Sequence, residues 1–279
     1  MTAYLSYSFD DNEAFINTFD EAPLWSAAFG LLLFKHLELK PNLSIIDIGS
    51  GAGFPLMELA GRCGNSCKLY GLDPWKNANN RARQKIKNYG LTNVEIIESS
   101  AEQIPLDDHS IDLIVSNLGI NNFKDPETVF RECSRVLKPN GKLALTTNLN
   151  GHWATFYQIF YETLQTLGKE DLITALKQDE AHRGTVETVS KLFSNNGFTV
   201  TRHFEESFEM KFVDGTAFLN HHFIKLGWLT SWLTLFPKGA LKEIFIALEQ
   251  NLNLYAGKNN GLVLTVPMAF IEGENKIKN

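Results

Sequence analysis

The sequence predicts a doubly wound α/β fold, in which helices cover both faces of a mainly parallel sheet. Strand-like and helix-like segments alternate from about residue 43 to 148, glycines follow the first strand, and an acidic residue follows the second. This alternation implies parallel pairing, because each helix returns the chain to the edge where the previous strand began. With 279 residues, 44% of them apolar, the chain can bury a sizeable core of this kind.

The elements of this α/β region follow one another in a regular order. The expected strands cover residues 43–48, 68–72, 94–97, 111–116 and 142–147, and the expected helices cover 55–62, 76–88 and 127–136. The last helix is supported by Val129, Phe130, Cys133 and Val136, which recur at helical spacing.

The pattern changes after residue 150. Residues 152–195 and 215–253 predict helices, 198–213 alternates apolar and polar residues as a long strand, and 262–271 predicts a final strand. We expect these two strands to add an antiparallel edge to the sheet. The helical segment between them then forms a cap above one end. The expected division is an N-terminal helical lid over 1–42, an α/β core over 43–213 and 261–273, and a cap over 214–260.

Composition limits the partners. The formal net charge is −6, whereas proteins that coat nucleic acid or anionic lipid need a basic face. The 3 cysteines, Cys63, Cys67 and Cys133, are too sparse for a disulfide scaffold, and we expect no metal site. Neither a signal peptide nor an apolar run of the ~20 residues that a membrane helix needs is visible. We therefore expect a cytoplasmic protein without integral membrane association or a nucleic-acid partner.

The most informative stretch, residues 45–55, reads IIDIGSGAGFP. Asp47 precedes three glycines at alternate positions, Gly49, Gly51 and Gly53, with Ser50 among them. Such glycines allow a tight turn and let a ligand approach the backbone, and the helix that follows offers unpaired N–H groups to an anion.

An acidic residue stands at the end of the second strand. Asp73, followed by Pro74, lies twenty residues after Gly53, which places it beside the glycine loop in a doubly wound sheet. A carboxylate there can accept both ribose hydroxyls of an adenosine. The sequence therefore predicts a ligand that contains adenosine.

The glycine spacing separates two classes of adenosine ligand. Dinucleotide folds favour G-x-G-x-x-G, whereas this chain has G-x-G-x-G, and bulky Phe54 follows. This loop, with Asp47 before it, resembles the S-adenosylmethionine site of class I methyltransferases. Further stretches resemble the same family: SSAEQIP at 99–105, IDLIVSN at 111–117 before Leu118, and RVLKPNGK at 135–142.

Together these motifs resemble the methyltransferase type 11 subgroup, which includes ubiquinone and menaquinone biosynthesis methyltransferases. The resemblance covers about residues 43–148. It implies a Rossmann-like, seven-stranded, mostly parallel sheet with an antiparallel edge, and S-adenosyl-L-methionine as the cofactor, with S-adenosyl-L-homocysteine as product. It also implies these cofactor-binding residues: Asp47, Gly49, Ser50, Gly51, Gly53, Asp73, Pro74, Ala101, Glu102, Asn117 and Leu118.

Methyl transfer from a sulfonium is an in-line displacement, so the protein must chiefly align the reactants and exclude water. A base matters only where the acceptor must lose a proton. The catalytic residue is left unknown, with His152, His221 and His222 as candidates. On one helix the adjacent His221 and His222 would point about 100° apart, so at most one would face the site.

The acceptor is expected to be a small, partly apolar molecule. Aromatic residues are concentrated between Phe204 and Phe236, and Phe223 and Trp228 there, with Trp25 and Asn117, are the candidate substrate contacts. The acceptor atom, the pathway and the oligomeric state stay open.

The same residues bear on other possible functions. An NAD(P)-dependent oxidoreductase is disfavoured by the glycine spacing, and a non-catalytic S-adenosylmethionine-binding protein stays open. Arsenite methylation would need more thiols than this chain offers. A malonyl-carrier methyltransferase would need an arginine, and Lys211 and Lys225 are the only basic residues between Glu205 and Phe236.

Overall fold

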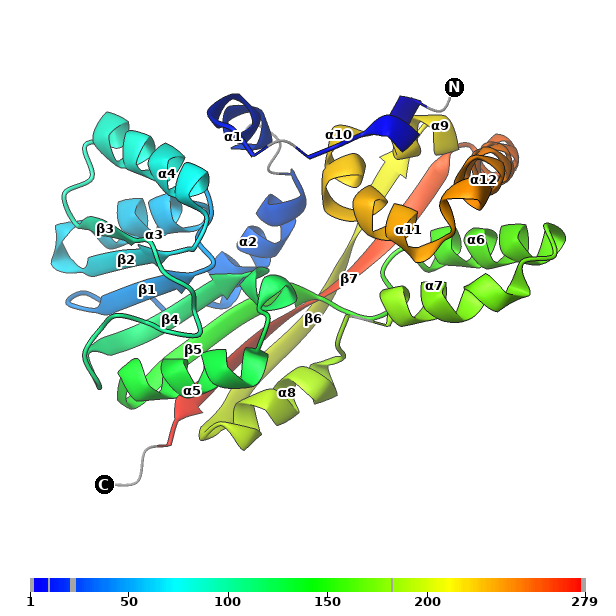
Figure 1. Ribbon diagram of the computed structural model, residues 1–279. Coiled ribbons are helices and arrows are strands. Elements are labelled where there is room, and N and C mark those ends of the chain that lie inside the picture. The colour runs from blue at the N-terminus through cyan, green and yellow to red at the C-terminus, as the bar shows by residue number, and fades with distance from the viewer. Residues whose placement is uncertain (1–2, 10, 21–23, 182, 277–279) are drawn as a thin grey trace. The chain divides into compact units, whose positions relative to one another are not determined.

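The computed structural model describes residues 3–9, 11–20, 24–181 and 183–276, so parts of the expected lid lie outside the described residues. A seven-stranded sheet runs in the order β3-β2-β1-β4-β5-β7-β6 (Figure 1). The strands are β1 (Ser44–Ile48), β2 (Lys68–Leu72), β3 (Val94–Ile97), β4 (Ile111–Asn117), β5 (Leu137–Asn148), β6 (Phe198–Phe212) and β7 (Leu262–Asn275). Strands β1 to β5 pair in parallel, and β7 pairs antiparallel to β5. The predicted Rossmann-like sheet with an antiparallel edge is therefore confirmed.

The chain divides into two compact units. Unit 1 comprises Met1–Asp10, Leu149–Arg183 and Ser207–Pro267, and unit 2 comprises Asp11–Asn148, Gly184–Glu206 and Met268–Asn279. The expected cap over 214–260 falls in unit 1, where residues 149–183 join it. The division into lid, core and cap stays a prediction.

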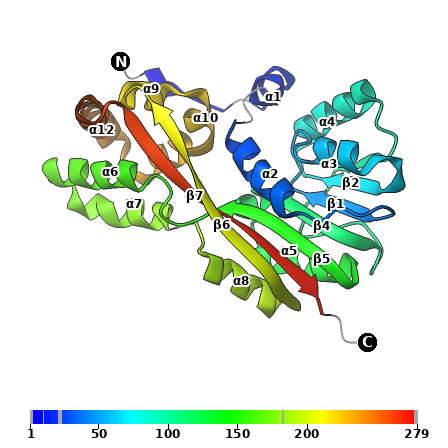
Figure 2. The same cartoon turned by 180° about the vertical axis from the view of Figure 1, so that it is seen from behind.

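Unit 2 holds the parallel strands and the helices that cover them. Its helices are α1 (Glu13–Asp20), α2 (Leu24–His36), α3 (Leu56–Cys63), α4 (Lys76–Tyr89), α5 (Pro126–Val136) and α8 (Val186–Asn195). Helices α5 and α8 lie side by side on one face of the sheet (Figure 1), and α2 packs on β4 and β5 on the other face (Figure 2).

Local sequence explains these elements. Strands β1 and β4 are almost entirely buried, which is why most of their residues are apolar and do not alternate regularly with polar ones. Helix α5 begins where the Asp125 carboxylate accepts the backbone N–H of Thr128 at 3.1 Å. Its apolar residues are fully buried, as their spacing predicts.

Unit 1 is built mainly from helices. They are α6 (Ala154–Thr166), α7 (Ile173–Glu180), α9 (Gly215–Asn220), α10 (His222–Ile224), α11 (Thr230–Leu235) and α12 (Lys238–Asn259), with a π-helical turn at Lys225–Leu229. The buried rings of Trp153, Phe156 and Trp232 belong to its core. Among the residues that the structure describes, no helix combines the length and apolarity needed to cross a membrane.

The structure corrects the expectation of unbroken helix over 215–253. The helix is interrupted at His221, which has an extended backbone (φ −61°, ψ 130°), and it is interrupted again at Phe236. The alternation in β6 also did not predict burial: Phe204 is 38% exposed, and the side chains from His203 to Ser207 are all exposed. Because β6 is the edge strand of the sheet, an alternating pattern there does not require a buried face.

Candidate functional site

The glycine loop joins β1 to α3 at the carboxyl end of the parallel strands, within unit 2. Gly49, Gly51 and Gly53 have φ values of 75°, 49° and 101°, a region that side chains with a Cβ rarely adopt. A Cβ on Gly49 would lie 3.1 Å from the Gly119 Cα, whereas a Cβ on Gly51 would meet no heavy atom within 4 Å. The loop therefore packs closely against the protein at Gly49 and leaves open space beside Gly51.

Asp73 lies against this loop, as predicted. Its carboxylate accepts the N–H of Gly51 at 2.9 Å and the N–H of Trp75 at 2.8 Å. Burial raises the pKa of Asp73, and these two N–H groups partly offset the rise. Each oxygen keeps a further lone pair for a ligand hydroxyl.

Asp47 is a buried acidic residue beside this loop. Its side chain is fully buried, and neither carboxylate oxygen has a hydrogen-bond partner among the described residues, although the Leu56 N–H lies close enough to lower the pKa slightly. Burial, reinforced by repulsion from Asp73, raises the pKa of Asp47 well above its usual range. A cationic ligand would relieve this cost.

The packing of Phe54 explains why the glycine loop has no glycine at position 54. A Cβ on Gly30 of α2 would lie 2.3 Å from the Phe54 ring, so Phe54 packs against this helix where a dinucleotide loop carries its third glycine. Ser50 is also buried, and its hydroxyl has no partner in the described part of the chain.

Asn117 and Leu118 lie at the end of β4. The Asn117 amide is engaged at both ends, because its Oδ1 accepts from the Thr146 hydroxyl at 2.7 Å and its Nδ2 donates to the Ser26 carbonyl at 3.1 Å. Leu118 has a φ of 70° and donates its N–H to the Thr146 carbonyl. Asn117 thus ties α2 to the sheet, and its contact with a ligand stays a prediction.

The remaining predicted cofactor residues differ in burial and in hydrogen bonding. Ala101 is buried, Pro74 is exposed, and the Glu102 carboxylate accepts the N–H groups of Lys124 at 3.2 Å and Asp125 at 3.4 Å. Trp25 is buried in α2 with its ring 5.3 Å from that of Phe29.

Trp75 and Asp11 were missed at the sequence level. The Trp75 indole donates to the Asp11 carboxylate at 2.8 Å, and Asn77 donates to the same carboxylate at 3.0 Å. These bonds hold the segment that follows Asp73. The place of Trp75 directly after Asp73-Pro74 was a usable signal, whereas nothing in the sequence linked it to Asp11.

The other candidates belong to unit 1. His152 is 1% exposed, and burial lowers its pKa to about 3. Its ring lies 6.5 Å from that of Trp228, which in turn lies 5.1 Å from that of Phe223. His152, Phe223 and Trp228 are therefore neighbours in one aromatic cluster.

The expectation that His221 and His222 diverge around one helix was wrong. Because His221 precedes α10 with an extended backbone, the two rings do not diverge around one helix; they stack with centroids 4.4 Å apart. Burial, with the charges of His222 and Lys225, lowers the pKa of His221. In the ranges that the structure describes, no group of three or more His, Cys, Asp or Glu side chains is arranged to hold a metal ion.

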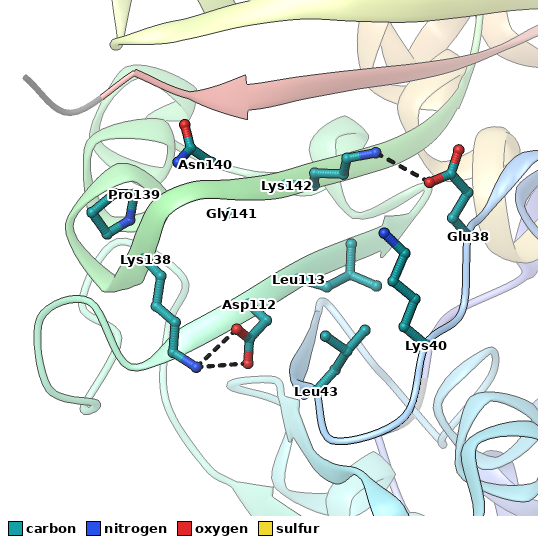
Figure 3. A pocket seen from close by; sticks show the side chains of 10 residues that line it. All are labelled: Glu38, Lys40, Leu43, Asp112, Leu113, Lys138, Pro139, Asn140, Gly141 and Lys142. Carbon is teal, nitrogen blue, oxygen red and sulfur yellow. Dashed lines mark hydrogen bonds and ion pairs between the residues drawn. The ribbon is translucent and has the colours of Figure 1, made fainter.

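A cavity of about 220 Å³ lies at the opposite end of the parallel strands (Figure 3). Half of its lining residues are charged. Lys138 donates to both Asp112 oxygens at 2.8 Å, and Lys142 pairs with Glu38 at 3.5 Å. None of the predicted site residues lines it. The glycine loop, rather than this cavity, is the candidate cofactor site.

Comparisons with known proteins match the part of the chain that contains the glycine loop. Residues 46–145 match the family described as a methyltransferase domain. A demethylmenaquinone methyltransferase of Geobacillus sp. (strain WCH70) is 32% identical over 127 residues, which cover 46% of this chain and 54% of the relative. One from Listeria welshimeri is 27% identical over 182 residues, covering 62% and 77%. The chain spans about half the length of the first curated relatives that it matches.

Solved structures show the same fold. The YcgJ protein from Bacillus subtilis superposes with a TM-score of 0.59 at 18% identity, covering 90% of this chain and 99% of that chain. A SAM-dependent methyltransferase from Aquifex aeolicus gives a TM-score of 0.54 at 24% identity, covering 70% and 92%.

Residues 46–145 therefore match a methyltransferase domain, and the chain has the fold of solved methyltransferase structures, as the motifs predicted. This match does not favour an NAD(P)-dependent oxidoreductase.

Proposed function

We propose that this chain transfers the methyl group of S-adenosylmethionine to a small, partly apolar acceptor. The observation that carries the proposal is the junction of the glycine loop with Asp73, beside the uncompensated Asp47 carboxylate. The loop is open at Gly51 and lies beside an acidic pair, and the buried polar atoms there have no partner among the residues that the structure describes. These features suit a ligand that carries both positive charge and hydroxyl groups.

The residues of this site divide the binding between them. Asp73 would accept the ribose hydroxyls, and the loop amides with the start of α3 would hold the cofactor's carboxylate. Asp47 would balance the cofactor's positive charge in a place that water does not reach. The cofactor supplies an electrophilic methyl group, and the protein aligns the acceptor with it and excludes water.

The names of the relatives and the aromatic residues of this chain support a small, partly apolar acceptor. The relatives are named demethylmenaquinone methyltransferases, so their acceptor is a small molecule. In this chain Phe223 and Trp228 are the proposed apolar contacts. The absence of a nucleic-acid partner and the cytoplasmic location stay predictions.

Calorimetric titration tests the proposal. S-adenosylhomocysteine should bind and NAD should not. The Asp73→Ala variant should lose at least tenfold in affinity for S-adenosylhomocysteine, because each hydrogen bond to a charged acceptor contributes about 1.5–3 kcal/mol. Asp171→Ala, at an exposed aspartate, is the matched control and should bind normally.

Two results would contradict the proposal. Tight binding of NAD would assign the loop to a dinucleotide. Unchanged affinity for S-adenosylhomocysteine in Asp73→Ala would remove the ribose contact from Asp73.

A further inference from the structure

The cavity at the opposite end of the parallel strands lies within unit 2 and shares no lining residue with the glycine loop (Figure 3). Its volume of about 220 Å³ is below the range of about 300–1,000 Å³ that is usual for drug-sized ligands. A ligand of this cavity is therefore a small molecule. The lining includes three lysines, two acidic residues and three apolar residues: Lys40, Lys138, Lys142, Glu38, Asp112, Leu43, Leu113 and Pro139.

An irregularity in strand pairing forms one wall of this cavity. Between two paired positions, β4 has one residue, Asp112, whereas β5 has four, residues 138–141, and all of these line the cavity. The turn is tight, because Asn140 has a φ of 63° and a Cβ on Gly141 would lie 2.9 Å from the Lys138 carbonyl oxygen. Bulges in strand pairing recur next to functional sites, where they redirect side chains.

Two of the charged side chains neutralise each other. The Lys138 ammonium donates to both Asp112 oxygens at 2.8 Å, and the Ser44 N–H donates to one of them, also at 2.8 Å. This pair therefore leaves no net charge for a ligand.

Lys142 belongs to a second balanced group. It pairs with Glu272 at 3.1 Å and with Glu38 at 3.5 Å. Arg202 pairs with the same two carboxylates, at 2.6 Å and 3.2 Å. Two cations and two carboxylates therefore balance one another on this side of the cavity.

Lys40 adds a positive charge that these groups do not balance. In the described ranges of the chain, its ammonium has no ion-pair or hydrogen-bond partner. Its backbone is held, because the Lys40 carbonyl accepts the Cys67 thiol at 3.3 Å. Figure 3 shows the Lys40 side chain extending from the loop after α2 toward the side of the cavity where Lys142 pairs with Glu38. The cavity therefore combines an available ammonium with apolar surface from its leucines.

We propose that this cavity binds a small apolar carboxylate, with the carboxylate on Lys40 and the apolar part on Leu43 and Leu113. A lysine ammonium is a compact charge on a flexible stem, and one unbalanced positive charge matches one carboxylate. Burial of the apolar part adds affinity in proportion to its area. The site lies apart from the glycine loop, so the inference goes beyond the proposed function and does not depend on it.

Ligand-observed NMR titration of the full chain at constant ionic strength tests the inference. The probes are benzoate, benzamide with the same ring and no charge, and acetate with the same charge and no ring. We expect benzoate to bind at least threefold more tightly than benzamide, which is within the range of an exposed ion pair, and at least tenfold more tightly than acetate.

Substitutions assign the preference to this cavity. Lys40→Gln should abolish the preference for benzoate over benzamide, and Lys40→Arg should retain it because the charge is kept. Asp112→Asn should strengthen benzoate binding, because it releases Lys138 from its ion pair. Lys87→Gln, at an exposed lysine of α4, makes the same change in net charge as Lys40→Gln and is the matched control.

Three results would overturn the inference: equal affinity of the wild type for benzoate and benzamide, equal affinity for benzoate and acetate, or an unchanged preference in Lys40→Gln. Binding of S-adenosylhomocysteine is measured in the same samples. Competition between it and benzoate would also overturn the inference, since it would place the probe at the glycine loop. Failure of S-adenosylhomocysteine to bind the wild type would overturn only the proposed function.

Discussion

Asp47 illustrates how a single residue can be unfavourable for folding and useful for binding. Its carboxylate is fully buried beside Asp73, with no hydrogen-bond partner among the described residues. Strain of this kind is common at ligand sites, where removing it stabilises the protein and impairs function. The same cost applies to His152 in unit 1, whose ring nitrogens have no hydrogen-bond partner in the described ranges of the chain.

The Asp47→Asn variant should therefore be more stable than the wild type near neutral pH. Burial raises the pKa of Asp47 in the folded protein above its value in the unfolded chain. The free energy of unfolding is therefore highest below pH ~4, where Asp47 is protonated in both states, and it falls as the pH rises. The advantage of the variant should grow with pH, by up to about 1.4 kcal/mol for each pH unit. Urea denaturation without cofactor at several pH values measures it.

Two further measurements make this test specific. Affinity for S-adenosylhomocysteine should fall in Asp47→Asn, and Asp107→Asn, at an exposed aspartate, should change neither quantity. A stability difference that does not vary with pH would contradict the assignment to Asp47.

At the scale of elements, the sequence predicted the parallel strands well. The bounds 68–72 and 94–97 coincide with β2 and β3, since these strands are short apolar runs between clear turn signals. It predicted the helices of unit 1 less well. Apolar residues occur on all sides of the helices expected over 215–253. Their spacing therefore did not reveal the interruption at His221 or the π-helical turn at Lys225–Leu229. Periodicity reports buried faces, but not how short helices are joined.

A substitution in the glycine loop can distinguish an effect on stability from an effect on ligand binding. Gly51 has a φ of 49°, and a Cβ there would meet no heavy atom within 4 Å. Gly51→Ala should therefore cost only the backbone strain of about 1–2 kcal/mol, because no protein atom is displaced. If the cofactor lies against this loop, the added methyl should reduce affinity for S-adenosylhomocysteine at least tenfold.

Gly61→Ala is the matched control for this loop. Gly61 lies in α3 with equally open surroundings but without a positive φ, so alanine should raise stability by about 0.5–1 kcal/mol and leave binding unchanged. Retained affinity in Gly51→Ala would show that no ligand approaches the backbone at this position.

At the scale of the whole molecule, the sequence identified the cofactor machinery but not the grouping of the helices around it. The motifs between residues 43 and 148 are local, so each could be recognised in a short stretch of chain. Arg183 belongs to unit 1 only because distant segments pack together, and amphipathic spacing does not say which partner a helix covers.

The two units share strands, which predicts how a ligand stabilises the chain. Residues of β6 and β7 are divided between unit 1 and unit 2, so neither unit can unfold without disrupting a strand of the other. We therefore expect S-adenosylhomocysteine to slow hydrogen exchange through global unfolding equally in β4 of unit 2 and α12 of unit 1. At a hundred times its dissociation constant the gain is about 2.7 kcal/mol, or roughly hundredfold slower exchange.

Amides of the glycine loop should gain additional local protection, because the ligand covers them directly. Exchange followed by mass spectrometry at peptide resolution measures both effects, and NAD at the same concentration is the control. Slowing confined to unit 2 would mean that the units unfold independently despite the strands they share. Slowing confined to unit 1 would contradict the placement of the cofactor at the glycine loop.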